Sequence, residues 1–201
     1  MRLETWLAAN KKTAPLFLDD NLVVRTFVQG SLKKLRRHPE FDNLIIETVE
    51  EGFLNDSWEG LIYVMHFLHK EGIVPVYVGK AEKKGVKNEI SYNLRDIRKN
   101  QHAFARWGYG LAYHVGDLSH AMFGGNAYKK PSPKYRRWAG KLFVQFEPPT
   151  LFERVYVSVI SWHTGMIGPS GLRGSVPSVE KEIIALASVS HSGILLNIDG
   201  R

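Results

Sequence analysis

Residues 60–102 constrain the fold more than any other stretch of this 201-residue chain. They contain two short segments rich in β-branched and aromatic residues, 61–67 and 74–78, with a Lys-Glu-Gly turn between them. Two such segments around a short polar turn predict a β-hairpin. A lysine-rich loop at 80–89 and a predicted helix at 91–101 follow the hairpin.

The hairpin carries two tyrosines of special interest, Tyr63 and Tyr77. Side chains alternate between the two faces of a strand, so Val76 and Val78 are expected on one face and Tyr77 on the other. Either pairing register can bring Tyr63 beside Tyr77. Two phenols next to cationic side chains suit phosphate chemistry, although a tyrosine in a strand is more often a packed aromatic residue.

The flanking segments predict both helices and strands. Residues 1–18 are interrupted by a proline and are interpreted as an arm, whereas apolar spacing predicts helices at 20–37 and 41–51. The alternating valines of 154–162 predict a central strand. A last helix is expected to begin at Pro177 and to end near residue 187 or 190.

These elements predict a single α+β domain over residues 1–201, with a small three-stranded sheet flanked by helices. Residues 60–102 and 154–197 would form its core, and residues 1–58 a helical extension. Residues 103–153 are rich in glycine, proline and cations and are interpreted as a basic insertion.

Composition excludes several classes of protein. Hydrophobic residues make up 44% of the chain and charged residues 23%, which is typical of a globular domain. No apolar run is long enough to cross a bilayer and the first residues do not resemble a signal peptide, so we expect a cytoplasmic protein. The chain has no cysteine, which excludes disulfides, thiolate metal sites and cysteine nucleophiles.

The positive charge is concentrated in the middle of the chain. Residues 80–141 carry 14 Lys and Arg against 4 Asp and Glu, although the whole chain has a net charge of only +7. Basic residues interleaved with aromatic ones indicate a surface for a polyanion such as nucleic acid, and the alternative is a solvated basic face. The candidates for DNA contact are Lys83, Lys84, Lys87, Arg95, Lys134, Arg136 and Arg137, the last three in a predicted loop at 134–138.

Two carboxylates of the last helix differ in their expected surroundings. Glu180 falls within the apolar stripe of that helix, whereas Glu182 lies at the edge of the stripe. A carboxylate that faces a core is unfavourable unless a cation or a metal accompanies it. Glu180 is therefore the more interesting of the two carboxylates.

Several short motifs, in this order, resemble those of the GIY-YIG nuclease superfamily, in particular its type II restriction endonuclease branch. The matching residues are LIY ending at Tyr63, YVG at 77–79 followed by Lys80, an Arg-x-x-x-His step from Arg98 to His102, an E-x-x-I-I pattern that begins at Glu180, and Asn197. Arg95 is the alternative to Arg98, and Glu182 is the alternative to Glu180.

The resemblance implies a sequence-specific endonuclease that cuts double-stranded DNA with Mg²⁺, for which Mn²⁺ can substitute, and that uses no small-molecule cofactor. Glu180 would hold the metal and Arg98 the scissile phosphate. Tyr63 would take the proton of the attacking water, with Lys80 and Arg98 favouring its phenolate. Tyr77 and His102 would orient the water or the phosphate, and Asn197 would fix the site by hydrogen bonding.

Cutting both strands of a palindromic site needs two active sites, which a two-fold homodimer supplies most simply. Two alternatives remain. One is a GIY-YIG nuclease for repair or homing, and the other is a non-catalytic nucleic-acid-binding protein on the same scaffold.

Overall fold

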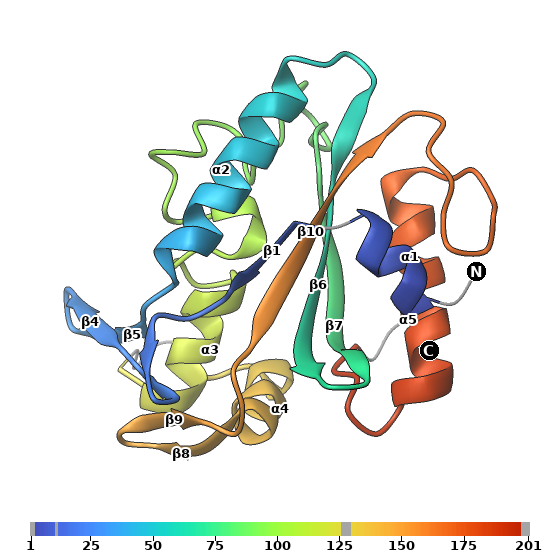
Figure 1. The fold of residues 1–201 in the computed structure, drawn as a ribbon. Coiled ribbons are helices and arrows are strands. Elements are labelled where there is room, and N and C mark those ends of the chain that lie inside the picture. The colour runs from blue at the N-terminus through green and yellow to red at the C-terminus, as the bar shows by residue number, and fades with distance from the viewer. Residues whose placement is uncertain (1–2, 11, 126–129, 198–201) are drawn as a thin grey trace.

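A computed structural model describes residues 3–10, 12–125 and 130–197. At its centre lies an antiparallel sheet with the strand order β1-β10-β6-β7. These strands are β1 (Lys12–Pro15), β6 (Trp58–His69), β7 (Gly72–Glu82) and β10 (Tyr156–His163). Helices flank the sheet, as the α+β prediction requires (Figure 1). The predicted sheet of three strands is wrong in number, because β1, expected as an arm, pairs with β10 as a fourth strand.

The two faces of the sheet bury separate apolar cores. One core lies under α2 (Pro39–Phe53), α3 (His114–Phe123) and α4 (Pro133–Leu142). The other lies under α1 (Leu3–Asn10) and α5 (Val176–His191). Figure 1 shows α2 and α3 on one side of the sheet and α1 and α5 on the other. None of the helices in the described part of the chain has the length and apolarity needed to span a membrane.

The predicted hairpin is confirmed as β6 and β7, but one of its side-chain orientations is not. Met65 pairs with Tyr77 and His66 with Pro75, so Val76 is an extra residue in the ladder. Such a bulge interrupts the alternation of side chains. Val76 therefore packs in the same core as Met65, whereas Val78 packs in the opposite one, and the expectation that Val76 and Val78 share a face is wrong.

The predicted helix at 20–37 is also wrong. The segment forms short strands β2 (Asp19–Asp20), β3 (Val23–Val24), β4 (Thr26–Gln29) and β5 (Leu32–Leu35). Asn21, Leu22 and Gly30 all have positive φ, which places tight turns where a helix would have to continue. β2 and β3 join β9 (Pro149–Leu151) and β8 (Phe143–Phe146) in a second sheet.

Two further elements differ from their predictions. Residues 91–101 form successive turns rather than a helix, and Asp96 has a φ of 52°, which a right-handed helix does not allow. Residues 134–138, expected as a loop, lie within α4. A short 3₁₀ turn, η1 (Phe104–Arg106), precedes α3. The helices predicted at 41–51 and from Pro177, and the strand at 154–162, are confirmed as α2, α5 and β10.

A buried arginine joins the N-terminal part of the chain to residues 103–153. The Arg37 side chain is 0% exposed, and its Nε donates to Asp42 Oδ1 at 2.6 Å. Its Nη1 donates to the carbonyl oxygen of Trp107 at 3.0 Å, and its guanidinium lies 4.1 Å from the ring centroids of Phe104 and Tyr109. The segment interpreted as an insertion is therefore packed into the main core.

We expect Arg37→Leu to lower the free energy of unfolding by about 3 to 5 kcal/mol, because the Asp42 carboxylate would lose its buried partner. The matched control is Arg25→Leu, since Arg25 pairs with Asp20 at the surface, where an ion pair contributes little. Urea denaturation measures both variants. Equal stability of the two would contradict the role assigned to Arg37.

Candidate functional site

The position of Tyr63 depends on the glycine that faces it. Tyr63 on β6 pairs with Gly79 on β7, and its side chain is almost completely buried. A Cβ on Gly79 would lie 2.4 Å from the Tyr63 ring and 2.6 Å from its hydroxyl. The ring can lie across β7 only because position 79 has no side chain. This contact gives a physical reason for the glycine of the YVG motif.

The Tyr63 hydroxyl lies at one end of a buried chain of hydrogen bonds. Its oxygen is 2.9 Å from His114 Nε2, and His114 Nδ1 is 2.8 Å from the Tyr135 hydroxyl. A neutral imidazole has one donor and one acceptor, so one tyrosine donates to His114 and the other accepts from it. Neither His114 nor Tyr135 is among the predicted site residues, and no motif marks them.

Burial is the main cause of the pKa shifts of Tyr63 and His114 in this chain of hydrogen bonds. Burial raises the pKa of the Tyr63 hydroxyl well above its ordinary value; Tyr77 adds to the rise and Arg106 opposes it. Burial likewise lowers the pKa of His114 well below its ordinary value, and the positive charges of Lys134 and Arg106 add to that fall. Both side chains are therefore neutral in the folded protein at pH 7.

Tyr77 has different surroundings although it lies on the same face of the hairpin. Its ring centroid is 6.4 Å from that of Tyr63, as the sequence led us to expect of a neighbouring pair. The Lys134 ammonium group donates to the Tyr77 hydroxyl at 3.1 Å and lies 4.6 Å from the centroid of its ring. Tyr77 is half-buried, so part of its surface remains accessible to solvent.

The arginine that acts on the buried tyrosines is Arg106, which the sequence analysis did not select. Its charge opposes the rise in the pKa of Tyr63 and of Tyr135. The guanidinium lies 5.5 Å from the ring centroid of Tyr113, and the side chain lines a cleft at the end of β7. Phe104, Ala105 and Arg106 all have positive φ, a backbone path that sequence spacing does not predict.

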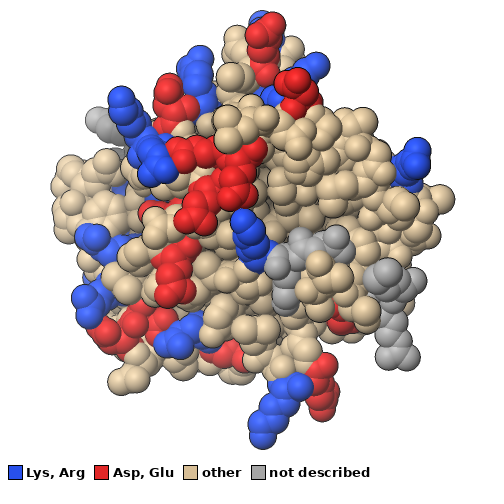
Figure 2. Space-filling view, turned by 45° about the horizontal axis from the view of Figure 1, so that its top comes forward, with Lys and Arg blue, Asp and Glu red and all other residues tan. Residues whose placement is uncertain are grey.

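Arg98 and His102, which the motifs suggested, point elsewhere. Arg98 Nε and Nη2 donate to the carboxylate of Glu50 on α2, and the Arg98 side chain is 66% exposed. The α2 sequence includes the acidic residues Glu47 and Glu50. Figure 2 shows a band of acidic side chains on one face of the molecule. The exposed His102 packs its ring against Tyr113 at 5.3 Å. Among the described residues, no hydrogen bond joins Arg98 or His102 to either tyrosine of the hairpin.

The two glutamates of α5, Glu180 and Glu182, have different contacts. Glu182 accepts a hydrogen bond from the backbone N–H of Ser170 and so stabilises the loop before α5. Glu180 is half-buried; partial burial raises the pKa of its carboxyl, Lys80 opposes that rise and Glu82 adds to it. Lys80 donates to Glu82 at 2.6 Å. Glu180 of α5 thus forms a charged group with Lys80 and Glu82 of β7.

Asn197 holds the outer edge of β7. Its Oδ1 accepts from the N–H of Val78 and its Nδ2 donates to the carbonyl oxygen of Val78, both at 2.9 Å. The N–H of Leu196 also donates to the carbonyl oxygen of Val76 at 2.7 Å. The amide therefore replaces the missing neighbouring strand between Tyr77 and Gly79, which protects an edge that could otherwise pair with another chain.

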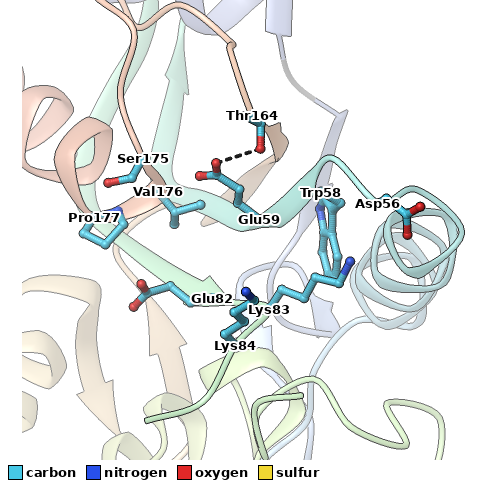
Figure 3. Close-up of a pocket in the computed structure, with 10 residues that line it drawn as sticks. All are labelled: Asp56, Trp58, Glu59, Glu82, Lys83, Lys84, Thr164, Ser175, Val176 and Pro177. Atoms are coloured by element: carbon cyan, nitrogen blue, oxygen red, sulfur yellow. Dashed lines mark hydrogen bonds between the residues drawn. The ribbon is translucent and has the colours of Figure 1, made fainter. Parts of the chain in front are cut away.

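A basic cleft of about 570 Å³ lies at the end of β7. Its cationic lining residues are Lys80, Lys84, Lys87 and Arg106. A second pocket of about 490 Å³ shares Glu82 and Lys84 with the cleft and adds Lys83 and Glu59 (Figure 3). Arg95 lies on the exposed turns after the cleft, and Arg136 and Arg137 are exposed on α4. The predicted cationic residues of the 80–89 loop therefore line one or both of these pockets.

The acidic residues fit a Mg²⁺ ion that has few protein ligands and keeps several waters. In the described ranges, no three Asp, Glu or His side chains are grouped closely enough to hold a metal ion by themselves. Mg²⁺ keeps several waters and is often bound through one or two carboxylates and substrate phosphates. Glu180, half-buried beside Glu82, is suited to that kind of site and not to a metal enclosed by protein ligands.

Comparisons of the chain with protein-family models, with curated proteins and with solved structures give no match. Functional inference therefore depends on the motifs and on the geometry of the site.

We expect Gly79→Ala to lower the free energy of unfolding by about 1 to 3 kcal/mol, because the new methyl group would displace the Tyr63 ring. Gly140→Ala is the control: no atom lies within 4 Å of its Cβ position, and alanine favours the helix α4 in which it lies. Thermal denaturation distinguishes the two. A Gly79→Ala protein as stable as the wild type would contradict the close approach of Tyr63 and β7.

His114 should make the protein less stable in acid. Its pKa is depressed in the folded state, so below about pH 6.5 the unfolded chain takes up a proton that the folded chain does not. The free energy of unfolding should fall by about 1.4 kcal/mol for each pH unit below that value. His114→Gln should reduce this slope. Denaturation of the wild type and of His114→Gln between pH 7 and pH 5 tests this, and equal slopes in the two proteins would refute it.

Proposed function

We propose that this chain is a Mg²⁺-dependent, sequence-specific endonuclease that hydrolyses phosphodiester bonds of double-stranded DNA. The observation that carries the proposal is the grouping of phenols, cations and one half-buried carboxylate around β7, beside a basic cleft. Tyr77 and Lys80 lie on this strand, and Lys134 of α4 donates to the Tyr77 hydroxyl. Arg106 and Glu180 approach the strand from two other elements. The resemblance to GIY-YIG nucleases supports the same function.

The chain's own residues can carry out most of what hydrolysis requires. Lys84 and Lys87 are placed to bind the DNA backbone along the cleft, and Arg106 to neutralise the scissile phosphate. Mg²⁺ bound at Glu180, with Mn²⁺ as a substitute, would stabilise the leaving 3′ oxygen. Asn197 keeps the backbone of β7 in place between Tyr77 and Gly79.

Arg106 replaces Arg98 as the phosphate-binding residue in this proposal. Arg98 is paired with Glu50 beside the acidic residues of α2, a surface that repels DNA. Glu182 is occupied by the loop before α5, so Glu180 remains the proposed metal ligand. A homodimer in the cytoplasm, with one active site for each strand of a palindrome, completes the proposal.

A non-catalytic nucleic-acid-binding protein is the second candidate. It is favoured by one observation: the Tyr63 hydroxyl is buried against His114, so in this conformation it does not face solvent. A repair or homing nuclease is the third possibility, which the pattern of DNA cleavage distinguishes.

The test is incubation of the purified protein with supercoiled plasmid and phage DNA, with Mg²⁺ or with a chelator. Discrete fragments that require Mg²⁺ are expected. Arg106→Ala and Glu180→Gln should each reduce the cleavage rate about 100-fold or more, as is typical when a transition-state contact is removed. Arg98→Ala is the matched control and should cleave within about threefold of the wild type, because it loses only an exposed ion pair.

Tight DNA binding without cleavage in any divalent metal would support the binding protein. Nicking or a smear of products would support a repair-type nuclease. Loss of cleavage in Arg98→Ala with normal cleavage in Arg106→Ala would restore the assignment made from the Arg-x-x-x-His motif.

A further inference from the structure

A tyrosine can act as a general base only if its phenol can lose its proton. The two tyrosines of the hairpin differ in how well their surroundings would stabilise the resulting phenolate. Tyr63 is 1% exposed and its hydroxyl is bonded to His114, a neutral group that brings no positive charge. Tyr77 is half-buried, and an ammonium group donates to its hydroxyl. A cation in direct contact favours a phenolate, whereas burial without a charged partner disfavours it.

Lys134 is held at Tyr77 by more than one contact. Its ammonium group lies 4.6 Å from the ring centroid of Tyr77, 5.2 Å from that of Trp138 and 5.3 Å from that of Tyr135. Three aromatic faces attract the same cation, each by cation–π interaction. The sequence predicts that Lys134 lies in a loop for DNA contact, but it is part of α4 and its ammonium group donates to Tyr77.

Besides Lys134, the ionisable side chains of His114, Tyr63 and Tyr135 lie near Tyr77. His114 on α3 has its ring centroid 5.3 Å from that of Tyr77 and is neutral. Negative charge on Tyr77 raises the pKa of Tyr63 on β6 and of Tyr135 on α4, in addition to the larger effect of burial. A phenolate at Tyr77 therefore keeps the other two phenols protonated.

We propose that Tyr77, with Lys134 at its hydroxyl, is the general base that takes the proton of the attacking water, and that Tyr63 is a positioning residue. This inference rests on the proposed nuclease function. It reverses the roles that the motif resemblance assigned to the two tyrosines. Tyr63 fixes β7 through its contact with Gly79 and orients α3 through His114.

The step balances without a further reactant. Tyr77 loses its proton to solvent before the reaction. The water oxygen then forms a bond to phosphorus as its proton passes to the Tyr77 oxygen. The bond from phosphorus to the 3′ oxygen breaks, its electron pair stays on that oxygen, and the oxygen takes a proton from solvent. The products are a 5′-phosphate and a 3′-hydroxyl.

The experiment compares Tyr77→Phe with Tyr63→Phe in single-turnover cleavage of a DNA fragment in Mg²⁺. Tyr77→Phe should lower the rate about 100-fold or more, as loss of a general base does, with DNA affinity within about threefold of the wild type. Tyr63→Phe should retain a rate within about tenfold of the wild type. Circular dichroism of both variants establishes that they are folded.

Two lysine variants on α4 test the cation. Lys134→Gln should raise the pH at which cleavage is half-maximal by about one unit, because the phenolate loses its partner. Lys141→Gln, at the exposed end of the same helix, should leave that pH unchanged. A purely DNA-binding role for Lys134 would weaken affinity without moving the pH profile, and this result would overturn the proposal.

Failure of the two proposals is distinguishable. If the wild type cleaves DNA and Tyr77→Phe cleaves it equally well, the role of Tyr77 is refuted while the nuclease function stands. If Tyr63→Phe alone abolishes cleavage, Tyr63 is the base. If the wild type cleaves no DNA in any divalent metal, both the nuclease function and the role of Tyr77 are refuted.

Discussion

The close approach of Tyr63 to the backbone of Gly79 is the constraint on which the site depends. Because position 79 lacks a side chain, the phenol ring lies across β7 and its hydroxyl reaches His114 on α3. His114 in turn bonds Tyr135 on α4. The absence of a side chain at position 79 thus lets Tyr63 link the hairpin to α3 and, through His114, to α4. For this reason β7, α3 and α4 form a single site.

The edge position of β7 explains how residues from both faces of the sheet meet. Tyr77 lies on the face covered by α3 and α4, whereas Lys80 and Glu82 approach Glu180 of α5, which covers the other face. If β7 were an inner strand, a further strand along its free edge would lie between the groups on the two faces. Asn197 and Leu196 bond the exposed backbone of β7, so the strand can remain at the edge without pairing with another chain.

Basic and acidic residues are concentrated in different parts of the structure, as they are in different parts of the sequence. The basic residues of the loop after β7 line the cleft, whereas α2 carries five acidic residues, one of which pairs with Arg98. Figure 2 shows a band of acidic side chains on one face of the molecule. Arg98 illustrates why proximity in sequence misleads. It comes only eight residues before Arg106, yet Arg98 pairs with Glu50. The left-handed backbone at Asp96 interrupts the predicted helix, and residues 104–106 beyond it are left-handed as well.

The sequence by itself determined the hairpin, α2, β10 and α5, because their apolar periodicity and turn residues act locally. It also marked Tyr63, Tyr77, Lys80 and Glu180 as a potential group. It could not determine the four-stranded sheet, since β1 pairs with the distant β10. It also missed the strands at 19–35, because their turns depend on positive φ at Asn21, Leu22 and Gly30 and because β3 pairs with the distant β9. Nor could it select His114, Arg106 or the bond from Lys134 to Tyr77. Those contacts join residues 51 or more positions apart or follow an irregular backbone, and only the packed tertiary structure brings them together.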